Sequence, residues 1–271
     1  MTDENQAEAA EGSSFGLSFV LLPEVWLPTL DALNAALTAQ GVAPASPGEP
    51  SEPSEPSEEA EAANRILSCQ FEGGSAFVSM MPAPFPWNDL AGPAATAWWW
   101  PEATEALEGH AAHLVVALRN TEGDALDQTL RLTRLTAALA EAAGAVGIYW
   151  GNGPLVHSRE TFVADSKGAS REELPVHLWV EQRMFSTREG TVSVFTSGLA
   201  TFGTMEIEIR ESTDQPSDLL ELVFGLSGYL IQHGPVIEDG DTVGGTPEEK
   251  IVARHLPSEW EREGPVLVLE F

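Results

Sequence analysis

Two glutamates on one predicted strand are the first residues whose types and spacing could do chemistry. The segment MEIEIR at 205–210 alternates strictly between apolar and charged residues. Glu206 and Glu208 therefore share one face, about 7 Å apart at roughly 3.4 Å per residue. Glu181, on a neighbouring predicted strand, is a third candidate catalytic residue. Carboxylates at this separation could serve hydrolysis or hold a divalent cation. The same alternation also predicts the solvated face of a half-buried antiparallel strand, which would account for both glutamates without any function.

The loop VIEDGDTVGGTPEEK at 236–250 supplies two further carboxylates, Asp239 and Asp241, as candidate metal ligands. They could form one wall of a site with the two glutamates. A calcium loop of the EF-hand kind needs oxygen donors at alternate positions and a glutamate at the twelfth. Val243 and Lys250 occupy two of these positions instead. Phosphate is disfavoured because the helix start that follows the glycines is acidic. The loop is therefore predicted to be mainly a structural double turn.

Trp98, Trp99 and Trp100 are the candidate binding residues, because three consecutive indoles cannot all face one core. At least one should be exposed or cover a groove; the alternative is a wedge between helix and sheet. The six histidines are scattered without the spacing of a metal site. The sequence contains no nucleophile elbow, P-loop, dinucleotide fingerprint or zinc-binding helix motif. It therefore identifies no confident catalytic residue and predicts no cofactor.

The charge balance restricts the class of partner. The chain has 13 basic and 42 acidic residues, a net charge of −29. Part of this excess lies in segments predicted to be disordered, but the remaining body is acidic too. Such a surface repels the nucleic acid backbone and anionic lipid, so neither nucleic acid nor a membrane is an expected partner. It favours a basic protein partner or simply solubility.

The cytoplasm is the expected compartment. No apolar run approaches the length that a membrane span needs. The acidic, polar start of the sequence lacks the features of a secretory signal. A single cysteine, Cys69, excludes an internal disulfide framework and a cysteine-rich zinc site.

The chain is predicted to have two halves, an α/β half at 15–158 and an α+β half at 170–271, packed as one body. Residues 1–14 are expected to be a disordered acidic tail. A proline- and glutamate-rich insertion at 46–63, with a Ser-Glu-Pro repeat, is also expected to be disordered, because it contains little that could bury a core.

The fold class predicted from hydrophobic periodicity is α+β with mixed sheets. The first half has β-α-β-β-α-β character, and strands at 113–118 and 145–150 should pair in parallel across a helix at 125–143. The second half should be an antiparallel meander of strands at 174–185, 191–199 and 205–210, followed by one long helix. Two glycines in that helix, Gly225 and Gly228, suggest a close approach to a sheet.

The second half resembles the bacterial domain-of-unknown-function family 4261. The matching stretches are LPVHLWVE at 174–181, FTSGLATFGTMEIEI at 195–209 and DGDTVGGTPEEKI at 239–251. The region from about residue 100 is similar to what precedes this domain in longer members. The resemblance implies no activity, cofactor or catalytic residue.

Three hypotheses about function follow. The first is a non-enzymatic protein-binding or accessory factor of the immunity type, which neutralises a basic partner. It is favoured because the chain lacks a complete catalytic set. The alternative is a metal-dependent or carboxylate acid–base enzyme that uses Glu206, Glu208, Asp239 and Asp241. A homo-oligomeric structural role is the third.

Overall fold

The computed structural model describes residues 16–48, 65–120, 122–186, 190–244, 250–260 and 262–271. The predicted α+β class with mixed sheets is confirmed. The predicted disordered tail at 1–14 and most of the insertion at 46–63 lie outside the described residues. Within the described ranges, none of the helices is long and apolar enough to cross a membrane.

The first half contains a seven-stranded sheet in which all neighbouring strands are antiparallel. The strand order is β2-β3-β4-β5-β1-β6-β7. The strands are β1 (Gly16–Leu22), β2 (Ser46–Pro47), β3 (Ile66–Phe71), β4 (Gly74–Met81), β5 (Ala112–Asn120), β6 (Gly147–Trp150) and β7 (Leu155–Ser158). Strands β1, β4, β5 and β6, with the helices α1 (Leu30–Ala39) and α5 (Ala125–Ala143), form the predicted β-α-β-β-α-β arrangement. It has the split form, in which β1 lies between β5 and β6.

The predicted direct pairing of the strands on either side of α5 is wrong. β5 and β6 run in the same direction, but β1 lies between them and is antiparallel to both. The connection through α5 therefore passes over β1 to reach β6, instead of joining two adjacent strands. Hydrophobic periodicity identifies each strand, but it carries no information on which strand from elsewhere in the chain enters the gap.

Helix α5 has clear local causes for both of its ends. Asp124 and Asp127 form a reciprocal capping box at its start, and Gly144 ends it in the left-handed conformation at φ 58°. Its buried face packs on β1 and β5, where the Thr136 hydroxyl hydrogen-bonds with that of Ser18 at 2.6 Å.

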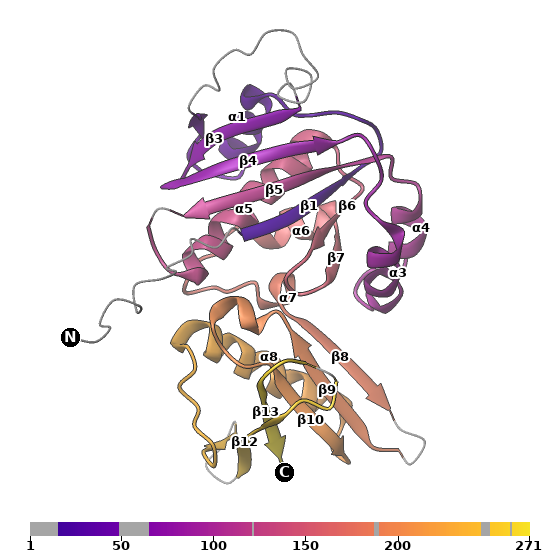
Figure 1. Cartoon of the computed structure of the whole chain (residues 1–271), viewed down its shortest axis with the longest axis vertical. Helices are drawn as coiled ribbons and strands as arrows, with labels where there is room; N and C mark the ends of the chain where they lie inside the picture. Colours follow the sequence, from indigo (N-terminus) through magenta and orange to yellow (C-terminus); the bar gives the residue numbers. More distant parts are fainter. Residues whose placement is uncertain (1–15, 49–64, 121, 187–189, 245–249, 261) are drawn as a thin grey trace, which may run out of the picture.

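Helices cover the two faces of this sheet unequally (Figure 1). Three helices, α1, α5 and α6 (Arg159–Ser166), lie on one face. Two short helices, α3 (Trp87–Thr96) and α4 (Ala103–Glu108), form a smaller buried cluster with Leu21 on the other face, near β7.

The start of the predicted disordered insertion is ordered. Residues 46–47 form β2, an edge strand in which Ser46 pairs with Gln70, and Gly48 N–H donates to Ser68 O at 3.1 Å. Proline is tolerated here because an edge strand needs hydrogen bonds on one side only.

The second half contains a six-stranded sheet of order β11-β12-β13-β10-β9-β8. Its elements are α7 (Val176–Trp179), β8 (Glu181–Ser186), β9 (Val192–Ser197), the 3-10 helix η1 (Leu199–Phe202), β10 (Ile207–Ser212), α8 (Pro216–His233), β11 (Thr242–Val243), β12 (Ile251–Pro257) and β13 (Pro265–Glu270). The predicted antiparallel meander β8-β9-β10 and the long helix are both present. β10 also pairs in parallel with β13.

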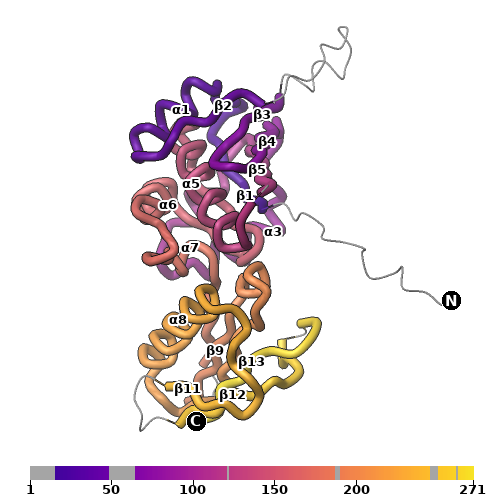
Figure 2. The backbone as a smooth tube through the Cα atoms, turned by 90° about the vertical axis from the view of Figure 1, so that its left-hand side faces the viewer, coloured from indigo at the N-terminus to yellow at the C-terminus, as the bar shows by residue number. Residues whose placement is uncertain are grey.

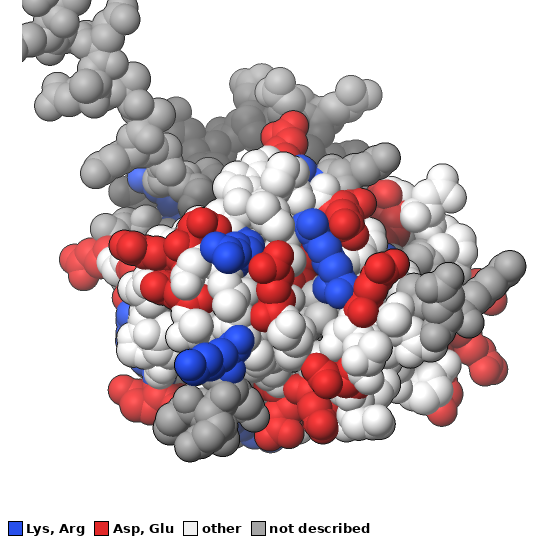
Figure 3. Space-filling view, turned by 90° about the horizontal axis from the view of Figure 1, so that it is seen from below, with Lys and Arg blue, Asp and Glu red and all other residues white. Residues whose placement is uncertain are grey.

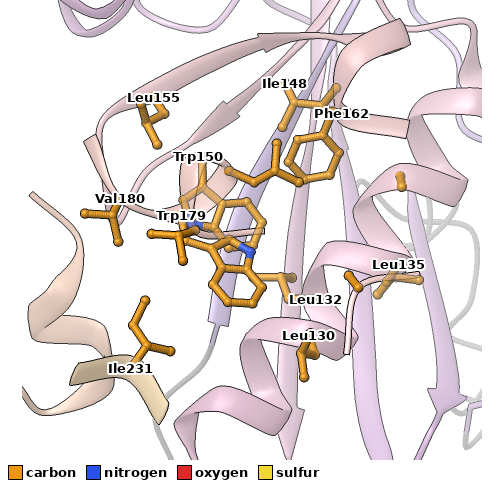
Figure 4. Close-up of a cluster of buried hydrophobic side chains, with 14 of the residues drawn as sticks. Leu130, Leu132, Leu135, Ile148, Trp150, Leu155, Phe162, Trp179, Val180 and Ile231 are labelled. Carbon is orange, nitrogen blue, oxygen red and sulfur yellow. The ribbon is translucent and has the colours of Figure 1, made fainter. Parts of the chain in front are cut away.

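The strand predicted at 174–185 begins late, because its first part forms α7. This short helix turns the Trp179 side chain into the interior, where its Nε1 donates to Thr133 Oγ1 at 2.8 Å. Figure 4 shows Trp179 beside Trp150, with Leu132 from α5 and Ile231 from α8 in the same buried cluster. The two halves lie end to end along the long axis, and this cluster draws on both (Figure 2).

Candidate functional site

The three candidate catalytic glutamates are buried, so the prediction that Glu206 and Glu208 lie on a solvated face is wrong. Glu208 is 0% exposed, Glu181 is 4% exposed and Glu206 is 8% exposed. Residues 258–260 and Arg262, which lie between β12 and β13, supply side chains that cover this face of the sheet. The alternation identified the face correctly, but a distant part of the chain removes it from solvent.

The Glu206 carboxylate accepts hydrogen bonds from backbone N–H groups at the start of η1. Its Oε1 accepts from the backbone N–H groups of Gly198 at 2.8 Å and Ala200 at 3.2 Å. Its Oε2 accepts from Thr196 Oγ1 at 2.7 Å, and that hydroxyl in turn accepts from Ile207 N–H. The carboxylate therefore satisfies donors where the β9–β10 connection leaves the regular ladder.

Glu208 accepts hydrogen bonds from three residues. Arg210 donates to its Oε2 through Nη2 at 2.7 Å, and Ser258 Oγ donates to its Oε1 at 2.5 Å. The backbone N–H of Glu259 adds a longer bond of 3.4 Å. This carboxylate therefore ties the covering segment to the middle of the sheet.

Glu181 joins the same cluster through arginines. Its Oε1 accepts from Arg183 Nη2 at 2.6 Å. Burial raises the pKa of Glu181, and the hydrogen bond and charge of Arg183 oppose that rise. Arg262 contacts the same cluster. It donates to Ser197 Oγ at 2.8 Å, and its Nη1 is 3.8 Å from Glu206 Oε1.

Aromatic rings close the cluster from outside. The Trp260 and Phe195 ring centroids are 4.9 Å apart, and the Arg262 guanidinium lies over the Phe195 ring at 4.9 Å. Donors from the protein thus occupy the oxygens of Glu206 and Glu208. Such an arrangement stabilises a sheet–loop contact, whereas acid–base catalysis needs a carboxyl group that faces a substrate.

The sequence does contain a signal for part of this network. In both Glu181-Gln182-Arg183 and Glu208-Ile209-Arg210 an arginine follows a glutamate by two residues. In a strand this spacing puts both side chains on one face. Ser258 and Arg262 could not be found in this way, because they come from some fifty residues further along the chain.

The two candidate metal ligands lie elsewhere in the sheet and serve as turn residues. Asp241 Oδ2 accepts from Glu238 N–H at 2.8 Å, and Asp239 Oδ1 accepts from His255 N–H at 2.9 Å. The first contact closes the turn that leads into β11, and the second ties this turn to β12; the first of the two predicted turns is therefore present. Residues 245–249 lie outside the described residues. In the described part of the chain, no group of three or more His, Cys, Asp or Glu residues could hold a metal ion.

A groove of about 940 Å³ lies between α8 and this same loop. Among the described residues, its lining combines apolar side chains with three acidic residues and contains no lysine or arginine. The apolar residues are Leu222, Leu226, Tyr229, Val236, Ile237 and Val243. The acidic residues are Asp218, Glu221 and Asp241, all of them exposed. The groove was not predicted from the sequence.

The glycines of α8 explain the shape of the groove and correct one prediction. Gly225 was expected to approach a sheet, but a Cβ placed there would meet no atom within 4 Å. It lines the groove, and its missing side chain leaves the groove open. A Cβ on Gly228 would lie 3.6 Å from Val176 of α7, an ordinary contact with a helix rather than a sheet.

The three tryptophans point in different directions. Trp98 is 73% exposed. Trp99 is partly buried: its Nε1 donates to Val156 O at 3.0 Å and its ring stacks on His157. Trp100 packs against the small cluster beneath α3 and α4. One indole is therefore available at the surface, and the other two act as the wedge that was the alternative prediction.

His157, next to Trp99, is a buried residue that the sequence did not single out. It is 1% exposed, and within the described residues neither ring nitrogen has a hydrogen-bond partner of good geometry. Burial lowers the pKa of His157 to about 3, with the charge of His177 acting in the same direction. The nearby Leu178 carbonyl opposes part of this shift.

Replacing His157 with leucine should make the protein less sensitive to acid. The unfolded chain binds a proton on this histidine below a pH of about 6.5, whereas the folded chain stays neutral down to about 3. Each pH unit in this window should therefore cost the parent about 1.4 kcal/mol of unfolding free energy that His157→Leu does not lose. Urea denaturation of both proteins at pH 8, 6 and 5 measures the difference. Parallel pH profiles would contradict the assignment.

Comparison with known proteins finds a family match. Residues 195–270 match the family described as a domain of unknown function (DUF4261). This stretch contains both the predicted match at 195–209 and the whole of the loop at 239–251, so the resemblance is confirmed there. The stretch at 174–181 and the region from about residue 100 lie outside it. No curated protein and no solved structure matches the chain. The matched stretch covers the groove and all of the buried network except Glu181 and Arg183.

Proposed function

We propose that this chain is a protein-binding factor that holds a basic segment of a partner in the groove beside α8. The observation that carries the proposal is the composition of the groove: its described lining joins apolar side chains to three exposed carboxylates and includes no basic side chain. A partner helix or strand with one apolar and one basic face would match both features.

The charge of the rest of the molecule supports the same kind of partner. The end formed by the second half shows basic side chains standing singly among acidic ones (Figure 3). A basic segment approaching this end would be attracted over a long range and would meet little repulsion. An accessory or immunity-type factor that works in the cytoplasm and neutralises a basic protein would have these properties.

The alternative function, a metal-dependent or acid–base enzyme, has less support. It requires Glu206 and Glu208 to face a ligand, but hydroxyl, guanidinium and backbone donors occupy both. Its other two residues, Asp239 and Asp241, lie beside β11 and β12 and bind backbone N–H groups. Binding therefore remains the better supported proposal.

Filling the groove tests the proposal. In Gly225→Arg a long cationic side chain enters the groove, and the helix propensity of the site improves by about 0.7 kcal/mol, so loss of folding would not explain a loss of binding. The probe is a labelled helical peptide with one leucine face and one lysine face. We expect its dissociation constant, measured by fluorescence anisotropy, to rise at least about tenfold in this variant, since the added side chain fills the groove and its charge repels the lysines.

Gly92→Arg is the matched control. Gly92 lies in α3, is exposed, and a Cβ there would also meet nothing within 4 Å. It adds the same charge far from the groove, so it should leave peptide binding unchanged. The corresponding peptide with a glutamate face should not bind. Equal weakening by both arginines would mean that only net charge attracts the peptide, and the groove would lose its role.

A further inference from the structure

The first sheet has an open face, which lies on the side opposite α5. Val20 and Leu22 of β1 point towards α5 and are buried, whereas Leu21 points the other way, into the small cluster beneath α3 and α4. Those two short helices cover only the end near β7. In Figure 1 the strands β4, β5 and β1 lie in front of α5, and no helix lies in front of them in the described part of the chain.

The open sheet face carries apolar side chains on all four of its strands. In register, Leu17 lies opposite Ala117 and Ala117 opposite Phe77, while Phe19 lies opposite Val115. Its principal side chains are Leu17, Phe19, Ile66, Phe77, Met81 and Val115. Four of these six are exposed large hydrophobic side chains. A contiguous apolar surface of this kind marks an interaction site.

The same face is nearly free of charge. Among the positions of β1, β3, β4 and β5 that point to it, Arg119 at one border is the single Asp, Glu, Lys or Arg. The other polar positions are neutral, such as Ser68 and Ser79. This contrasts with a chain that carries 42 acidic residues. Interface cores are depleted in charge, and here the depletion coincides with the apolar residues.

We propose that two copies of this chain associate by packing their open sheet faces against each other. Any second copy carries the same strong negative charge, so the two can approach closely only through a surface without acids. Two such sheets would pack about 10 Å apart, as in a β-sandwich. A basic partner would gain nothing from this face, because it offers no carboxylate to pair with.

The size of the face predicts a weak dimer. Four strands at about 4.8 Å spacing and seven residues at roughly 3.4 Å give a flat area of about 450 Å² per copy. Stable interfaces bury about 800 Å² per partner, so this contact belongs to the transient class. Its formation should depend on protein concentration. The inference is independent of the proposed groove, which lies in the other half.

Sedimentation equilibrium of the full chain at rising concentration and two salt levels tests the proposal. Raising the salt from about 0.1 M to about 1 M shortens the Debye length from about 10 Å to about 3 Å. We expect the dimer to strengthen at high salt, because screening reduces the repulsion between like charges while apolar contact persists. A chain that stays monomeric throughout the series would overturn the proposal.

A matched pair of variants locates the interface. Phe77 and Phe224 are both 42% exposed, but Phe77 lies on the open sheet face and Phe224 on α8. Phe77→Glu should raise the dimer dissociation constant by about tenfold or more, since it buries unpaired charge, whereas Phe224→Glu should not. Phe77→Thr, which suits a strand, should weaken the dimer without adding charge. Equal effects of the two glutamates would overturn the proposal.

Residues 1–15, which precede β1, are the other occupant to consider. A shortened chain that begins at residue 16 should dimerise as the full chain does. A dimer that forms only after their removal would assign the face to that segment and would overturn the proposal.

Discussion

Replacing Gly153 with alanine is expected to lower the free energy of unfolding by about 3 kcal/mol. Gly153 follows β6 in the turn to β7 and packs against the ends of α7 and β9 in the second half. A Cβ there would lie 2.2 Å from the backbone oxygen of Trp179 and 3.0 Å from that of Ser197. Both obstacles are backbone atoms, so no side-chain rotation can relieve the overlap.

The neighbouring glycine of the same turn is the control. The atom nearest to a Cβ on Gly151 would belong to the Phe19 side chain, at 3.3 Å. A small rotation of that side chain can relieve the contact. Gly151→Ala should therefore cost less than about 1 kcal/mol. Guanidinium denaturation followed by tryptophan fluorescence measures both variants. Equal midpoints for the two would mean that the close approach at Gly153 does not constrain the fold.

Replacing Glu208 with alanine should lower the free energy of unfolding by about 3 kcal/mol. The substitution leaves a partly buried Arg210 guanidinium without its carboxylate, and Ser258 Oγ and Glu259 N–H without their acceptor. Because these donors belong to the segment that covers the sheet, limited proteolysis should also cut that segment faster in the variant.

Two further variants test whether the loss of stability comes from the burial of the Glu208–Arg210 pair and not from the loss of any ion pair. Glu270 pairs with Arg254 at 3.4 Å in the same sheet, but both side chains are exposed. Glu270→Ala should therefore change the free energy of unfolding by less than about 0.5 kcal/mol. The double variant Glu208→Ala with Arg210→Ala should cost clearly less than the sum of the two single changes, since no buried charge is then left unpaired; Glu259, which also contacts Arg210, is exposed. Additive costs would show that the pair is not coupled.

Local patterns predicted the elements of this chain better than their partners. The range 125–143 was correct for α5, because apolar periodicity and the glycine that ends the helix are both encoded within it. The hairpin between β3 and β4 is another local feature, with Glu72 and Gly73 in its turn at positive φ. The predicted pairing of β5 with β6 was wrong, because β1, a strand from the start of the described chain, lies between them.

The candidate site divides in the same way. The strand pattern put Glu206 and Glu208 on one face, but whether that face is wet depends on Ser258 and Arg262, which no local pattern connects to it. The groove beside α8 was not predicted, because it also depends on the loop after the helix. Gly225 was noticed, yet its open surroundings could be known only once the loop after the helix was placed.

The position of β1 in the middle of its sheet also has a consequence for how fast the protein folds. Val20 pairs with Leu114 on one side and Ile148 on the other, so both partners are far along the chain. Closing such large loops loses chain entropy before any long-range contact compensates for it. We therefore expect the first sheet to form in milliseconds to seconds, with β1 joining only after α5 has brought its two neighbours into line.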